Sequence, residues 1–211
     1  MPPKIKTDQE RQQIRTLILD AARELFVELG VAAVTMREIA RRVNYSPTAI
    51  YLHFKDKEEL IRELCRTDFL SLASQLKAIG AIPDPIDRLV QLGLGYVQFA
   101  MRYPNHYQLM FMTAQMPAKT PETGLEAGNP EQDAYAGLKL MVAAAHAEGC
   151  FREELTDPDL IAQTLWAGLH GICALEITMK DDCWVEWRPF ETRVRLMQEV
   201  MMRGLIRTTE K

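Results

Sequence analysis

The stretch TMREIARRVNYSPTAIYLHF, from Thr35 to Phe54, decides how the rest of the chain is interpreted. Thr35 and Glu38 form a T-x-x-E capping box, which satisfies two backbone N–H groups at the start of a first helix. Asn44 suits the left-handed conformation that ends a helix, and Ser46, followed by proline, suits the N-cap of a second one. Two helices joined by a short turn predict a helix-turn-helix, whose second helix lies in the major groove of DNA.

The second helix carries two kinds of side chain. Ile50 and Phe54 form its apolar side. Its other side and the residues just beyond it carry hydroxyl, imidazole and ammonium groups, the donors that reach phosphates and base edges: Thr48, Tyr51, His53, Lys55 and Lys57. A structural hairpin with solvated polar side chains explains the same pattern, because helical hairpins are common in all-helical proteins.

Length and composition are those of a globular protein. The 211 residues are enough for one large domain or two modest ones, and 47% hydrophobic residues supply a core. No apolar run reaches the roughly 18 residues that span a bilayer, and the N-terminus has no apolar run of the signal-peptide type. We therefore expect a cytoplasmic protein without a membrane partner.

Charge is distributed unevenly along the chain. The net charge of −4 argues at first against a nucleic-acid partner. Residues 1–57, however, hold 10 Lys and Arg against 7 Asp and Glu, so the basic excess lies with the helix-turn-helix and the acidic excess lies elsewhere. This asymmetry indicates that the N-terminal end meets a polyanion.

The four cysteines give no sign of a metal or disulfide site. They are scattered without a C-x-x-C pair, at Cys65, Cys150, Cys173 and Cys183. We interpret them as small hydrophobic residues and expect neither a metal nor another cofactor. Thiol sensing by Cys150 or Cys173 has no support in the pattern.

Apolar periodicity and capping signals predict an all-α chain of about nine helices. A basic arm over residues 1–8 precedes them, and residues 114–130 are expected to form a loop. The helix near 159–179 is apolar nearly all round, which indicates burial on more than one side. Besides the two helices within 35–54, helices are expected at about 10–29, 57–78, 85–103, 105–113, 131–148, 159–179 and 190–207.

Residues 18–61 resemble the DNA-binding domain of the tetracycline-repressor (TetR) family. The run combines A-A-x-x-L-F before a glycine, T-x-x-x-I-A, a turn, and Y-x-H-F-K-x-K-E-x-L, in order and at tight spacing. The C-terminal part is similar to one TetR subclass with a W-x-x-x-H-G signature, here Trp166 to Gly171, and in the stretch from Tyr103 to Phe111.

The resemblance implies an N-terminal DNA-binding domain over 1–56 and an effector-binding and dimerisation domain over 57–211. It implies a homodimer formed through the last two helices, a roughly palindromic operator in double-stranded DNA, and repression that a small molecule relieves. By position, Thr35, Tyr51, His53 and Lys57 resemble phosphate contacts, with Lys55 nearby. The candidates for base edges are Arg37, Tyr45 and Thr48.

The resemblance also implies a small-molecule effector among the middle helices. An apolar and aromatic lining with a few polar groups suits such a pocket, but it suits an ordinary core as well. His170 is a candidate anchor or a structural histidine. The candidate lining residues are Tyr96, Phe99, Tyr103, Tyr107, Met110, Phe111, Met141, Trp166 and His170.

Two further functions stay open at this point. His170, Cys173 and Glu176 lie on one helix face, as a catalytic base and nucleophile require, although burial explains that face more simply. One alternative is therefore a helical ligand-binding protein or enzyme in which the hairpin is structural. Our own expectation is that the protein is not an enzyme. The other alternative is a TetR-like activator, or a regulator without a small-molecule effector.

Overall fold

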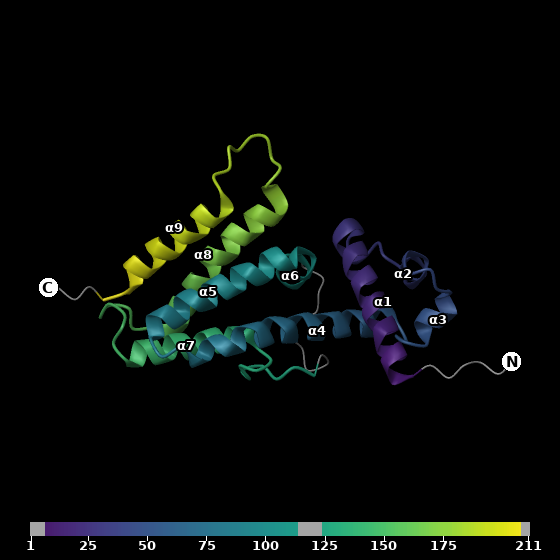
Figure 1. Cartoon of the computed structure of the whole chain (residues 1–211), viewed down its shortest axis with the longest axis horizontal. Coiled ribbons are helices and arrows are strands. Elements are labelled where there is room, and N and C mark those ends of the chain that lie inside the picture. The colour runs from purple at the N-terminus through teal and green to yellow at the C-terminus, as the bar shows by residue number, and fades with distance from the viewer. Residues whose placement is uncertain (1–6, 114–123, 208–211) are drawn as a thin grey trace. The chain divides into compact units, whose positions relative to one another are not determined.

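The computed structural model describes residues 7–113 and 124–207 (Figure 1). Within these ranges the regular elements are nine α-helices and one short 3-10 helix, with no strand. The expected all-helical fold is therefore confirmed. Most of the expected N-terminal arm, and residues 114–123 of the expected loop, lie outside the described residues.

The contacts between residues divide the chain into two compact units. The boundaries fall after Asp68, before Asn105 and after Gly124, so α4 contributes to both units and α6 belongs to the first. The expected domain boundary between residues 56 and 57 stays a prediction.

The first unit contains α1 (Asp8–Leu29), α2 (Met36–Arg42), α3 (Pro47–Tyr51), α4 (Lys57–Lys77) as far as Asp68, and α6 (Pro104–Phe111) from Asn105. The second contains the rest of α4, η1 (Ala78–Ala81), α5 (Pro85–Arg102), α7 (Ala134–Ala147), α8 (Pro158–Met179) and α9 (Phe190–Leu205).

Local capping chemistry sets the helix ends in the first unit. α1 begins two residues earlier than expected, at Asp8, because Thr7 and Glu10 form a capping box. It ends before Gly30, whose φ of 81° lies in the left-handed region that favours glycine. The predicted capping box of Thr35 and Glu38 is present at the start of α2.

The core of the first unit is formed by the inner sides of its helices. Ile18 on α1, Ile39 on α2, and Ile50 and Phe54 at α3 are all 0% exposed. The predicted core role of the apolar residues in the helix-turn-helix is therefore confirmed. Phe26 on α1, at 2% exposed, completes the cluster.

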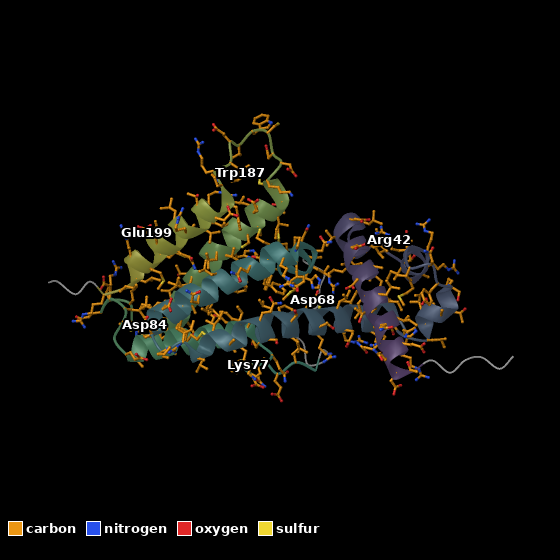
Figure 2. All side chains as sticks on the ribbon, in the orientation of Figure 1. Arg42, Asp68, Lys77, Asp84, Trp187 and Glu199 are labelled. Atoms are coloured by element: carbon orange, nitrogen blue, oxygen red, sulfur yellow. The ribbon has the colours of Figure 1, made fainter. Side chains whose placement is uncertain are left out.

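A buried ionic cluster joins three helices of the first unit. Asp68 on α4, labelled in Figure 2, is 1% exposed and accepts hydrogen bonds from Arg23 on α1. These bonds run from Arg23 Nε (3.1 Å) and Nη2 (2.7 Å) to the two carboxylate oxygens. His106 Nδ1 on α6 lies 3.0 Å from Asp68 Oδ1. The cluster therefore places one carboxylate between groups from α1 and α6.

The second unit is a helical bundle with its own core. α8 packs against α5, α7 and α9, and Figure 1 shows α8 and α9 side by side. α7 begins three residues later than expected because Asp133 caps it, and α9 ends at Leu205 because Ile206 pairs with Phe151 in an isolated bridge. The buried core residues are Leu89, Val142, Ala145, Phe151, Ile161, Ala162, Leu165, Met202 and Leu205.

α8 differs from the sequence expectation in one respect. Among the described residues it is the one helix whose length and composition would let it cross a bilayer. Polar residues such as Gln163, Thr164 and His170 interrupt the apolar run of α8. Its mean hydropathy nevertheless stays high enough for a helix that could cross a bilayer. Core helices of globular proteins share this length and composition.

Candidate functional site

The turn between α2 and α3 has the geometry that its residues predict. Asn44 has a φ of 56°, in the left-handed region, and the next N–H, from Tyr45, donates to the carbonyl of Ala40 at 2.9 Å. Ser46 then caps α3, since its Oγ accepts from the N–H of Ala49 at 3.2 Å. The turn is therefore fixed by a backbone hydrogen bond at the end of α2 and by a side-chain cap at the start of α3.

α3 has one buried and one exposed side. Ile50, together with Phe54 just after the helix, anchors it in the core. Thr48 and Tyr51 point outward, and Tyr51 is 50% exposed. An anchored helix that presents hydroxyl donors outward is suited to contact with phosphates and base edges.

Arg15 on α1 holds the end of the α3 segment in place. Its guanidinium lies over the Phe54 ring at 4.3 Å and donates to the backbone carbonyl of His53. Arg15 lies 38 positions before His53 and therefore outside the helix-turn-helix motif, so the motif did not predict either contact. They fix the segment that carries Tyr51 and His53.

Two of the predicted phosphate contacts also have intramolecular roles. The Thr35 hydroxyl donates to Glu38 Oε2 at 2.8 Å, and this bond is the first cause of a lowered pKa of the Glu38 carboxyl. Lys57 Nζ donates to the carbonyl of Val34 at 2.7 Å and to that of Val31. Lys57 therefore uses two of its three N–H donors to hold the segment between α1 and α2.

The other predicted DNA-binding residues differ in exposure. Arg37 and Lys55 are exposed, whereas Tyr45 and His53 are half-buried. Arg41, four residues after Arg37, is exposed on the same face of α2 and was not among the predicted contacts. The helical spacing from Arg37 is the sequence signal that indicates it.

Arg42, the last residue of α2 (Figure 2), has a different role from its neighbours. It pairs with Glu24 at 3.1 Å and with Glu28 at 2.7 Å on α1. These pairs tie α2 to α1, and the hydrogen bond to Arg42 is the first cause of a lowered pKa of Glu28.

In the second unit three of the predicted effector residues meet through their polar atoms. Trp166 Nε1 donates to the Tyr96 hydroxyl at 2.9 Å, and this hydroxyl lies 3.4 Å from His170 Nδ1. Burial lowers the pKa of His170 from its ordinary value, so the neutral imidazole is favoured. Tyr135, which was not predicted, packs on Trp166 with ring centroids 5.6 Å apart.

The remaining candidate effector residues do not form one group. Phe99 and Tyr107 are 0% exposed and lie in the cores of different units. Met141 is half-buried against the core of the second unit. The nine candidates divide between the second unit (Tyr96, Phe99, Tyr103, Met141, Trp166 and His170) and the first (Tyr107, Met110 and Phe111).

The possible catalytic residues on α8 have other contacts. Cys173 is 0% exposed, and Glu176 accepts a hydrogen bond from Arg193 on α9. Burial raises the pKa of a further thiol, Cys65, to about 12, which favours its protonated form. In residues 7–113 and 124–207, no group of three or more His, Cys, Asp or Glu side chains is placed to hold a metal ion.

The fold and the N-terminal geometry together define an all-helical protein with a helix-turn-helix. Two family models match the sequence, "Bacterial regulatory proteins, tetR family" over residues 18–64 and "Tetracyclin repressor-like, C-terminal domain" over residues 89–180. The chain belongs to the TetR family, as the resemblance of residues 18–61 implied.

Individual relatives are similar over different lengths. The HTH-type transcriptional regulator AcrR of Shigella flexneri is 46% identical over 59 residues, which are 28% of this chain and 27% of AcrR. The chain matches between 27% and 37% of the length of curated relatives such as AcrR of Shigella flexneri and UidR of Escherichia coli.

Solved structures are similar over nearly the whole chain. The TetR family regulator PfmR of Thermus thermophilus has a TM-score of 0.71 at 21% identity, covering 97% of this chain and 100% of PfmR. A tetR family regulatory protein of Rhodococcus RHA1 has a TM-score of 0.74 at 20% identity, covering 92% and 98%. At this identity the likeness shows the fold.

Proposed function

We propose that the protein is a DNA-binding transcriptional regulator that acts as a repressor. A homodimer binds a roughly palindromic operator in double-stranded DNA, and a small, largely apolar or aromatic effector releases it. The protein acts in the cytoplasm, apart from membranes, and is not an enzyme. Its membership of the TetR family supports the proposal.

The two-sided α3 is the observation that carries the proposal. Ile50 and Phe54 are fully buried, while Thr48 and Tyr51 are exposed. The outward hydroxyl groups lie in a segment with a basic excess. Such groups can bind the phosphates of DNA and also distinguish its base edges.

Each predicted DNA-binding residue has a place in this proposal. Arg37, Tyr45 and Thr48 contact base edges, and a bidentate contact of Arg37 with guanine would contribute about 1–3 kcal/mol of discrimination. The phosphate contacts come from Thr35, Tyr51, His53, Lys55 and Lys57. The intramolecular bonds of Lys57 support a further role, which is to hold the segment before α2 in position.

The homodimer in this proposal forms through α8 and α9. Both helices expose large apolar side chains, which favour burial against another apolar surface. They are Leu160, Leu175 and Met179 on α8, and Leu196 and Val200 on α9. In such dimers the recognition helices lie about 34–36 Å apart, one turn of the duplex.

The effector binds near the Tyr96, Trp166 and His170 cluster in this proposal. Binding sites for small molecules are mostly apolar with a few polar groups that fix orientation, and this cluster offers aromatic rings with a hydroxyl and a neutral imidazole. This combination of side chains favours an uncharged aromatic or apolar effector with a hydrogen-bonding group.

Fluorescence anisotropy with labelled DNA tests the proposal. The duplex is the region that flanks the protein's own gene, compared with a scrambled duplex at two salt concentrations. We expect tight binding to the flanking DNA that weakens with salt, by about 0.9 in the log–log slope for each neutralised phosphate. A folded dimer that binds neither duplex would contradict the proposal.

Two substitutions on α3 separate phosphate contact from base contact. Tyr51→Phe removes a phosphate donor, so we expect binding to weaken about tenfold on all operator variants alike. Thr48→Ala should instead relax the preference at one operator position. Anisotropy with singly substituted operators measures both effects, and Tyr103→Phe in the second unit is the control. If both variants bind every duplex like the parent, α3 is not the recognition helix.

A further inference from the structure

Leu52 is the most exposed large hydrophobic side chain among the described residues of the first unit. It is 82% exposed, compared with 50% for Tyr51, 52% for Leu29 and 46% for Leu17. A single exposed leucine is common on protein surfaces and needs no explanation by itself. The position of Leu52, directly after α3, is what indicates a functional role.

Leu52 points away from the core. It follows the last residue of α3 and keeps helical backbone angles, with φ −71° and ψ −19°. Ile50 and Phe54, two residues before and after it, are 0% exposed, so Leu52 lies about 200° around the helix axis from each of them. Thr48 is four residues earlier, so Leu52 extends the exposed face of Thr48 by one turn.

The exposed face of α3 therefore presents a hydroxyl at Thr48, followed by an apolar side chain at Leu52. A helix that contacted only phosphates would gain nothing from an exposed leucine among its donors. The major groove of DNA also displays one apolar group, the 5-methyl group of thymine, which apolar side chains contact. The order of groups on α3 suits a base edge followed by such a methyl group.

We propose that Leu52 is a specificity-determining residue that recognises the 5-methyl group of a thymine in each half of the operator. This inference rests on the proposed function, because it requires α3 to lie in the major groove. Burying a methyl group contributes enough to change affinity about fourfold in one half-site and about fifteenfold in both.

The test uses the full-length protein and an operator duplex located by footprinting. Each symmetric pair of thymines is replaced by uracil, which removes the methyl group and leaves the hydrogen-bonding pattern unchanged. We expect binding by the wild-type protein to weaken about fifteenfold at one such pair. Leu52→Ala should weaken binding to the thymine operator by a similar factor and make the protein insensitive to uracil at that pair.

The control variant is Leu29→Ala, the same change at a half-exposed leucine on α1. It should bind as the wild-type protein does and keep its sensitivity to uracil. Wild-type protein that binds the operator but is insensitive to uracil throughout, or equal uracil sensitivity in wild type and Leu52→Ala, overturns the role of Leu52 and leaves the regulator intact. Wild-type protein that binds no DNA specifically overturns the proposed function as well.

Discussion

His170 makes the stability of the protein depend on pH. Burial lowers its pKa in the folded state from the ordinary value of 6.5. As the pH falls below about 6.5, the unfolded chain therefore binds a proton that the folded chain does not, and the free energy of unfolding decreases. The decrease stops once the pH is below the folded pKa.

The corresponding prediction compares slopes rather than absolute stabilities. Urea unfolding between pH 8 and pH 5 should show the free energy of unfolding of the wild-type protein decreasing below about pH 6.5, and that of His170→Asn decreasing less. Comparing slopes removes any constant cost of losing the contact with Tyr96. Equal slopes would mean that His170 titrates alike in the folded and unfolded chains.

Local chemistry explains which single residues could be predicted from sequence. Thr35, Asn44 and Ser46 act on backbone groups within five residues of themselves, so the motif was sufficient. Lys57 could not be assigned in this way, because its carbonyl partners lie 23 and 26 residues earlier. The same holds for the pairing of Arg23 with Asp68, which are 45 residues apart.

At the scale of elements, the Asp68 carboxylate on α4 contacts Arg23 on α1 and His106 on α6. Asp68→Asn removes the charge that faces Arg23 and His106. Removing one partner of a buried ion pair leaves the other charge buried, so we expect a loss of about 3–5 kcal/mol in the free energy of unfolding. Urea denaturation measures the loss, and hydrogen exchange should show faster exchange in α6.

Glu63→Gln on the same helix is the matched control. It breaks the more exposed pair between Glu63 and Arg66 at 3.0 Å, and such pairs contribute less than about 1 kcal/mol. If Asp68→Asn is no more destabilising than this control, the cluster does not hold α6 to the first unit.

Helices were easier to predict than the surfaces they form. Proline and aspartate at N-caps and first positions located α5 and α8 to within a residue. The effector residues were harder, because an aromatic side chain on a helix looks alike in sequence whether it lines a cavity or fills a core. Phe99 and Tyr107, both fully buried, illustrate this limit.

At the scale of the whole molecule, the proposed dimer depends on the exposed apolar side of α9. Leu196 and Val200 are each 60% exposed and lie opposite Val194, which is 4% exposed. Leu196→Glu would place a carboxylate in the interface of each subunit. Since two leucines lose their burial, we expect the dissociation constant of the dimer to rise about a hundredfold or more.

Analytical ultracentrifugation measures this change, with Arg195→Glu as the control. Arg195 is an exposed neighbour on α9, so its reversal adds a carboxylate beside the apolar residues rather than among them. Leu196→Glu should leave a folded monomer that binds the operator weakly. A variant that remains dimeric at the wild-type dissociation constant would mean that α9 pairs through another face.

The spacing of the operator tests whether the dimer holds its two recognition helices rigidly. Inserting five base pairs at the operator centre turns one half-site by about half a turn and moves it by about 17 Å, so a rigid dimer docks only one subunit. Inserting ten base pairs returns both half-sites to the same face of the duplex but leaves them too far apart for a rigid dimer. We therefore expect both insertions to lower the affinity, measured by anisotropy, to that of a single half-site. Flexibly joined DNA-binding units would instead recover affinity with the ten-base-pair insertion, whereas the monomeric Leu196→Glu variant should bind all three duplexes equally weakly.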